Sequence, residues 1–155
     1  KPHATNGSKI DSKYVSNSMY SVIEGKPEKS KFFKGNKCSV NSIANPDNVT
    51  FIQNANTLII GEDTGSGHQN DYIWSYNLSK KELTRIQTTP YGSETTSPYI
   101  YNNIGGHGYM MSVVQHPYGE GDALTKEEDM AKTAHSKDDL KAYTGYVGPL
   151  PVINK

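Results

Sequence analysis

The chain lacks the features that would mark a membrane protein, a disulfide-stabilised protein or a nucleic-acid-binding protein. Cys38 is its only cysteine, so no disulfide can form within the chain. No apolar stretch approaches the roughly 20 residues that a membrane-spanning helix needs. Sixteen basic residues balance 16 acidic ones, and this balance favours neither a nucleic acid nor a membrane as a partner. Arg85 is the only arginine, which leaves the chain poor in planar anion-binding groups.

Small polar residues and tyrosine take the place of the missing apolar residues. Only 34% of the 155 residues are hydrophobic, and 11 tyrosines stand beside 3 phenylalanines and 1 tryptophan. Chains rich in Tyr, Asn, Ser, Thr and Gly are usually β proteins with many turns. The composition therefore predicts a mainly β fold with a modest core.

The sequence divides into three regions of one domain. Residues 1–44 are polar and lack periodicity, and we expect an extended arm followed by a surface loop. Residues 45–121 contain β-branched and aromatic runs separated by turn residues. Residues 122–155 combine helix-capping patterns with a closing segment.

Four short strands follow one another in the central region, in the runs NVTFI, TLIIGED, DYIWSYNL and LTRIQTT. Their hairpin-sized connections are typical of one blade of a β-propeller. The pattern partly recurs about 50 residues later, in SPYIYNN (97–103) and GYMMSVVQHP (108–117). We therefore expect a partial β-propeller of one to two blades of antiparallel strands, with residues 47–115 almost entirely β.

Short helices are expected near the C-terminus. Thr125 with Glu128, and Ser136 with Asp139, have the spacing of capping boxes. They predict helices over 125–134 and 137–143, the second ending near Gly145. The final run GYVGPLPVINK is expected to close the fold as an edge strand.

Acidic and amide side chains lie at the predicted strand ends. They are Asp47, Asn48, Glu62, Asp63 and Glu94. In a propeller, one end of every blade faces a common mouth, so these groups would converge there and offer the oxygen ligands that Ca²⁺ prefers. The same residue types are also ordinary turn formers, and this alternative stays open. His116 ends a strand in the run QHP and is a further candidate for the site.

Five strings, in this order and spacing, resemble the PhoX-type alkaline phosphatase family. They are NSIANPDNVTFI, LIIGEDTG, DYIWSYNL, PYGSETTSPYI and SVVQHPYGE, which together span roughly residues 36 to 121. The resemblance implies a bacterial phosphomonoesterase of the periplasm or the extracellular space. It also implies a β-propeller whose cofactors are calcium and iron.

By the resemblance, the metal-site residues are Asp47, Asn48, Glu62, Asp63 and Glu94, and His116 is a peripheral substrate-binding candidate. Family members are several times longer, so the chain resembles a C-terminal part. We accordingly expect an upstream segment or chain of the same enzyme as a partner, and a phosphomonoester as the substrate. Cys38 is not where the family's iron-bridging cysteine is expected.

A non-enzymatic module is the alternative interpretation. A calcium-stabilised β domain could bind carbohydrate or a protein partner through exposed tyrosines. The candidates are numerous, namely Tyr72, Tyr76, Tyr91, Tyr99, Tyr101 and Tyr109. Tyrosines of this kind also serve simply as packing residues within β sheets.

Overall fold

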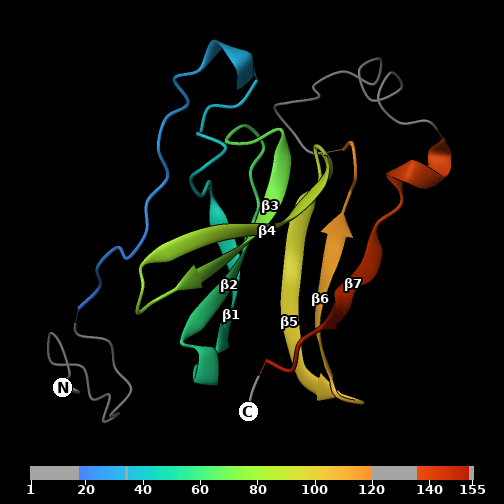
Figure 1. The fold of residues 1–155 in the computed structure, drawn as a ribbon. Coiled ribbons are helices and arrows are strands. Elements are labelled where there is room, and N and C mark those ends of the chain that lie inside the picture. Colours follow the sequence, from blue (N-terminus) through green and yellow to red (C-terminus); the bar gives the residue numbers. More distant parts are fainter. Residues whose placement is uncertain (1–17, 34, 120–135, 154–155) are drawn as a thin grey trace, which may run out of the picture.

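Two antiparallel sheets form the body of the protein (Figure 1). The computed structural model describes residues 18–33, 35–119 and 136–153. Strands account for 52% of the structure, so the prediction of a mainly β protein is confirmed. No helix within these ranges is long and apolar enough to cross a membrane.

The first sheet is a four-stranded meander in the order β1-β2-β3-β4. Its strands are β1 (Pro46–Ile52), β2 (Thr57–Glu62), β3 (Asn70–Asn77) and β4 (Glu82–Tyr91). A single 3-10 turn, η2 (Gln53–Ala55), joins the first two strands. The four strands that the sequence predicts are therefore present in the predicted order.

The second sheet has three strands in the order β5-β6-β7. They are β5 (Glu94–Ile104), β6 (His107–Gln115) and β7 (Tyr143–Leu150). Gly105 and Gly106 form the hairpin turn between β5 and β6 with φ angles of +59° and +89°. Positive φ at both central positions is what a tight hairpin of the right twist requires, and glycine adopts it without strain.

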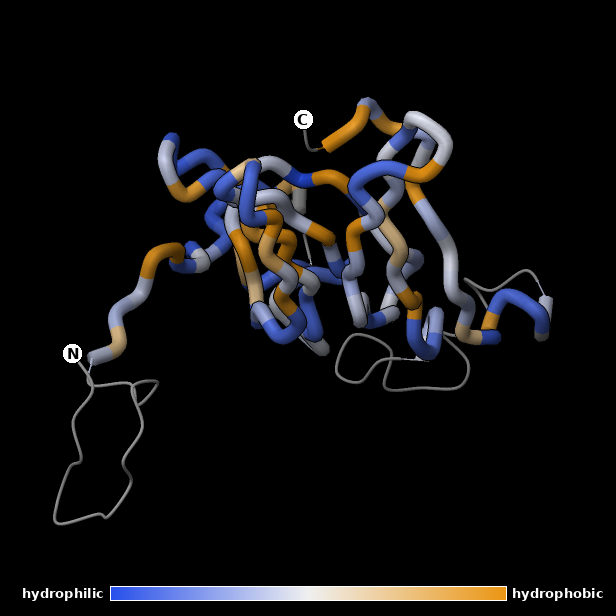
Figure 2. Tube along the Cα trace, turned by 90° about the horizontal axis from the view of Figure 1, so that it is seen from below, coloured by the Kyte–Doolittle hydropathy of each residue, from blue (hydrophilic) through white to orange (hydrophobic). Residues whose placement is uncertain are grey.

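One hydrophobic cluster lies between the two sheets. Ile59 and Ile73 of the first sheet pack with Met110 of the second, and Ile100 and Val147 border this cluster. Figure 2 shows hydrophobic stretches of chain within both groups of strands. Burial of these side chains holds the sheets together, because each removes apolar surface from water.

A second cluster lies on the other face of the first sheet, under the segment that precedes β1. Ile43 packs with Ile60 and Trp74 there, and the Tyr76 hydroxyl donates to the carbonyl of Val22 at 3.0 Å. The segment contains one short 3-10 turn, η1 (Lys31–Phe33). The segment that was expected to be a surface loop thus also covers one face of the first sheet.

The C-terminal helix prediction is wrong in length. The capping pattern at Ser136 exists, since its backbone N–H donates to the Asp139 carboxylate at 2.8 Å. Only a short 3-10 helix follows, η4 (Lys137–Leu140), and β7 begins at Tyr143. Gly145, expected at a helix end, lies inside β7. The predicted helix over 125–134 lies outside the described residues.

The closing edge strand is present as β7, which pairs only with β6. The partial propeller stays a prediction. A meander of four strands beside a sheet of three agrees with one to two blades, but two sheets do not by themselves define a ring.

Candidate metal centre

The adjacent acids Glu62 and Asp63 at the end of β2 point to different environments. Successive side chains of a strand lie on opposite faces of the sheet. Glu62 is fully buried, whereas Asp63 is exposed. The two acids therefore have different environments: the Glu62 side chain lies in the interior, and the Asp63 side chain lies at the surface.

The Glu62 carboxylate is the centre of a buried hydrogen-bond network. Its Oε1 accepts from the backbone N–H of Ala44 at 2.8 Å and from the indole N–H of Trp74 at 2.6 Å. Its Oε2 accepts from the backbone N–H of Tyr72 at 3.0 Å and contacts Nδ1 of His68 at 2.9 Å. A carboxylate offers about four acceptor positions, and these four contacts occupy them.

His68 links this network to the segment that precedes β1. Its Nε2 lies 3.0 Å from the backbone carbonyl of Ser39, which can only accept. Its Nδ1 faces Glu62, which also accepts three N–H groups. Both ring nitrogens of His68 therefore have a hydrogen-bond partner in the interior.

A second acidic group lies at the rim of the two sheets. It consists of Asp47, Asp63 and Glu94, and we call it the acidic rim group. One carboxylate oxygen of each residue lies within 4.8 Å of one oxygen of both others. Asp47 lies near the start of β1, Asp63 directly follows β2, and Glu94 begins β5. Residues 47 positions apart along the chain, from Asp47 to Glu94, thus meet at one point.

Local backbone geometry brings Asp47 to the rim. The pairing of β1 with β2 shifts in register between Pro46 and Asn48, so that Asp47 is the extra residue of a bulge. Bulges re-aim side chains at the ends of strands. The backbone N–H of Asp63 donates to the carbonyl of Asn45 at 3.1 Å, which holds the two segments together.

Thr95 fastens the second sheet to the end of β2. Its hydroxyl accepts from the backbone N–H of Glu62 at 2.8 Å and donates to the carbonyl of Glu62 at 3.0 Å. Gly61 makes this approach possible, since a Cβ atom there would lie 2.6 Å from the Thr95 hydroxyl oxygen. Because Thr95 is fixed, its neighbour Glu94 is placed beside Asp63.

Burial raises the pKa of Glu94, and the negative charge of Asp63 raises it further. Hydrogen bonds act in the opposite direction: Gln115 donates to Oε2 of Glu94 at 2.9 Å, and Nε2 of His116 lies 3.2 Å from the same oxygen. The net shift is upward. Burial and the neighbouring Asp63 thus both disfavour the charged form of Glu94.

The structure brings together some of the sequence-predicted residues and separates others. Asp47, Asp63 and Glu94 converge, and His116 contacts this group through Glu94. Asn48 lies beside it, and its side-chain amide donates to the Asp47 carboxylate at 2.6 Å. Glu62 and Glu94 were expected close together at one rim. They are linked through Thr95, yet their carboxylates have different partners.

Glu62 does not belong to the acidic rim group. Its acceptor positions are all occupied by protein donors, so it has no lone pair left to offer a metal. Glu62 is therefore a structural residue and not a candidate metal ligand. Sequence reasoning missed His68 and Thr95, and only the pleat of β2 signals that one of the paired acids must face inward.

The rim group fits calcium better than iron. Its donors are carboxylate oxygens, which are hard ligands suited to Ca²⁺, and the site opens to solvent for additional water ligands. Iron sites usually include imidazole or thiolate donors. Cys38 is not among the rim residues, and its backbone N–H donates instead to the carbonyl of Gly67. Nothing in this donor set is specific for iron.

Comparison of the chain with models of protein families, with curated proteins and with solved structures gave no match.

Proposed function

We propose that the acidic rim group binds Ca²⁺ and forms part of the metal site of a phosphomonoesterase. The observation that carries the proposal is the convergence of three carboxylates from three strands within 4.8 Å. Among the residues that the structure describes, no Lys or Arg side chain forms an ion pair with any of the three. A divalent cation is the partner that this charge lacks.

The resemblance of the sequence to PhoX-type phosphatases supports the reaction class. A calcium ion held by Asp47, Asp63 and Glu94 would neutralise phosphoryl oxygens of a phosphomonoester. The described residues contribute by holding the Glu94 carboxylate in position. Thr95 fixes the strand that bears Glu94, and Gln115 and His116 orient the Glu94 carboxylate.

Arg85 does not take part in this site. Its guanidinium lies over the ring of Tyr72, 4.6 Å from the centroid, and donates to the carbonyl of Val40. Phosphoryl transfer builds charge on several oxygens, which enzymes usually meet with metals and cationic side chains. We therefore propose that a further segment or chain of the same periplasmic or extracellular enzyme completes the site, and the resemblance implies iron as a second cofactor there.

The test is hydrolysis of p-nitrophenyl phosphate by the native protein in the presence of calcium. Asp63→Asn should lower kcat/KM by about 100-fold or more, because loss of an outer-sphere partner alone costs about 10–100-fold at metal sites. Residues 1–155 expressed alone should show no turnover. Equal activity of Asp63→Asn and the unchanged protein would refute the proposal, as would turnover of about 1–10³ s⁻¹ by residues 1–155 alone.

A second candidate function rests on exposed tyrosines of the second sheet. Tyr99, Tyr101, Tyr109 and Tyr146 lie on its outer face, where cross-strand pairing sets Tyr101 against Tyr109. Tyr99 is 57% exposed and Tyr146 is 69% exposed. This face supports the alternative of a calcium-stabilised module that binds carbohydrate or a protein partner. Tyr72 and Tyr76 do not contribute, because both are buried.

The two candidates differ in turnover. A module would bind calcium at the rim and hydrolyse no phosphomonoester in any context. Tyr146→Ala would then abolish binding of its partner while leaving calcium affinity unchanged. For the phosphatase, Tyr146→Ala should leave kcat/KM within about twofold, since Tyr146 packs against Tyr109 and is not a member of the acidic rim group.

A further inference from the structure

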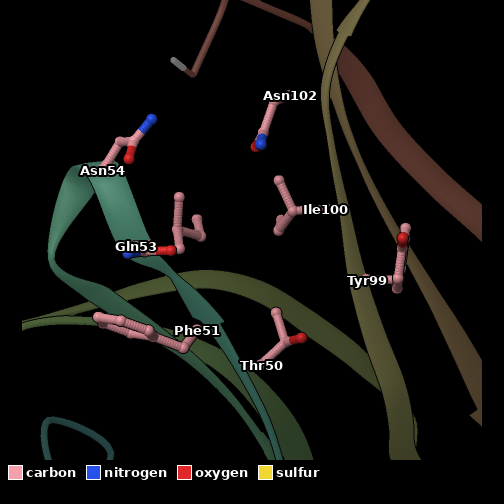
Figure 3. A pocket seen from close by; sticks show the side chains of 8 residues that line it. Thr50, Phe51, Gln53, Asn54, Tyr99, Ile100 and Asn102 are labelled. Atoms are coloured by element: carbon pink, nitrogen blue, oxygen red, sulfur yellow. The ribbon is translucent and has the colours of Figure 1, made fainter.

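A cavity of about 310 Å³ lies between the end of the first strand and the edge of the second sheet. Its walls come from β1, from the η2 turn and from β5. Figure 3 shows the carboxamide of Asn54 and that of Asn102 on opposite sides of this space, with Ile100 below Asn102. None of its lining residues belongs to the acidic rim group.

The described lining combines polar side chains with the apolar or aromatic side chains of Phe51, Ile52, Tyr99 and Ile100. Thr50, Gln53, Asn54 and Asn102 offer hydroxyl and amide groups, and Ile100 offers an apolar surface. Among the residues that the structure describes, no acidic or basic side chain lines the cavity. Such a site cannot hold a phosphate or a metal ion well, because neither charge would be compensated. It suits a neutral molecule that can both donate and accept hydrogen bonds.

The side chain of Asn102 indicates that a molecule bound in the cavity would donate a hydrogen bond. Its Oδ1 atom is buried and has no hydrogen-bond partner among the described residues. Its backbone is fixed, because its carbonyl accepts from the N–H of Ile153 at 3.2 Å. An unmatched buried acceptor is costly, and a hydroxyl or amide hydrogen of a bound molecule would remove that cost.

We propose that this cavity binds the ring of a neutral sugar. A hexopyranose presents hydroxyl donors and acceptors at its rim and an apolar C–H surface on its face, which matches the amides and Ile100. The cavity is near the lower end of the range of about 300–1,000 Å³ that ligand sites span, so one sugar ring is the appropriate size. The inference is independent of the rim group and of phosphatase activity.

The experiment is a titration of ¹⁵N-labelled protein, without calcium, with three neutral probes: methyl α-D-glucopyranoside, methyl α-D-mannopyranoside and N-acetylglucosamine. At least one should cause saturable shifts of the side-chain amide signals of Gln53, Asn54 and Asn102. The expected Kd is on the order of 1–10 mM, as is reasonable for a small ligand with few contacts. Glucose 6-phosphate should bind at least 10-fold more weakly than the best neutral probe.

Asn102→Leu should weaken binding at least 10-fold, since it keeps the side-chain volume and removes the amide. Asn41→Leu is the matched control, because Asn41 is exposed and lies outside the cavity, and it should leave the Kd unchanged. If Asn102→Leu does not fold, Asn54→Ala replaces it, because Asn54 is exposed. The proposal is overturned if no neutral probe binds, if glucose 6-phosphate binds as well, or if the cavity variants bind like the control.

Discussion

Two groups of acidic side chains, joined at the Glu62–Asp63 peptide, differ in how their charge is compensated. Glu62 is buried, accepts N–H groups of three residues and contacts Nδ1 of His68. The acidic rim group is largely exposed, and within the described part of the chain side-chain nitrogen atoms contact the carboxylates of Asp47 and Glu94. A buried carboxylate with all its acceptor positions occupied supports the fold, whereas exposed carboxylates with open acceptor positions are available to bind a cation.

The largest change in the free energy of unfolding is expected for substitution of Glu62. Glu62→Ala leaves three buried N–H donors and Nδ1 of His68 without their partner, and each buried polar group left unsatisfied costs about 1–3 kcal/mol. Asp63→Ala is the matched control at the next position and should change the free energy of unfolding by less than about 0.5 kcal/mol, as is usual for exposed positions. Urea unfolding without calcium measures both. Equal stability of the two variants would contradict the inference that Glu62 supports the fold whereas Asp63 does not.

A smaller loss of stability is expected for substitution of Gly61, which lies where the two sheets meet. In Gly61→Ala the new methyl group would lie 2.6 Å from the Thr95 hydroxyl oxygen and 3.0 Å from the Thr95 carbonyl oxygen. Such overpacking typically costs about 1–3 kcal/mol, and the displacement of β5 should also weaken calcium binding through Glu94. Gly145→Ala is the control, since a Cβ atom there meets nothing within 4 Å.

Urea unfolding and calcium titration of the two glycine variants test this link. If Gly61→Ala lost stability but kept its calcium affinity, Thr95 would hold the sheets together without placing the Glu94 carboxylate.

The smallest effect is a pH dependence at Glu94. Because its pKa is raised in the folded protein, the folded state binds more protons than the unfolded state from the ordinary pKa of about 4.3 up to the raised value. The stability that Glu94 contributes is therefore complete below that window and is lost as the pH rises through it. Glu94→Gln should abolish this part of the pH dependence.

The measurement is thermal unfolding of both proteins in EDTA at a series of pH values. The difference in Tm between the unchanged protein and Glu94→Gln should shift against the unchanged protein as the pH rises through the window. A difference that stays constant across pH would contradict the assignment of a raised pKa to this carboxyl.

Much of the fold was predictable because its strands carry local signals. The β-branched and aromatic runs of β1 to β4 and the glycine turn between β5 and β6 mark strands by residue type alone. The segment 137–143 was mispredicted because a capping pattern is local, whereas β7 is stabilised by pairing with β6, which lies far earlier in the chain. Tertiary pairing overrode the local preference there.

The site was predictable only in part, for a similar reason. Positions at strand ends suggested that Asp47, Asp63 and Glu94 would meet, and they do. The partners of Glu62 could not be foreseen, because Ala44 and Trp74 reach it from other segments of the chain. Glu62 and Asp63 are adjacent in the sequence and were therefore predicted to belong to one site. The pleat of the strand places their side chains on opposite faces.

Isothermal titration of the metal-free chain with calcium tests the central claim most directly. The unchanged protein should bind one Ca²⁺ with a Kd of about 10⁻⁴–10⁻³ M, the range of exposed extracellular calcium sites. Asp63→Asn should weaken that binding at least 10-fold while leaving the free energy of unfolding in EDTA unchanged or slightly higher. Absence of calcium binding by the unchanged protein, or equal affinity in Asp63→Asn, would contradict the account.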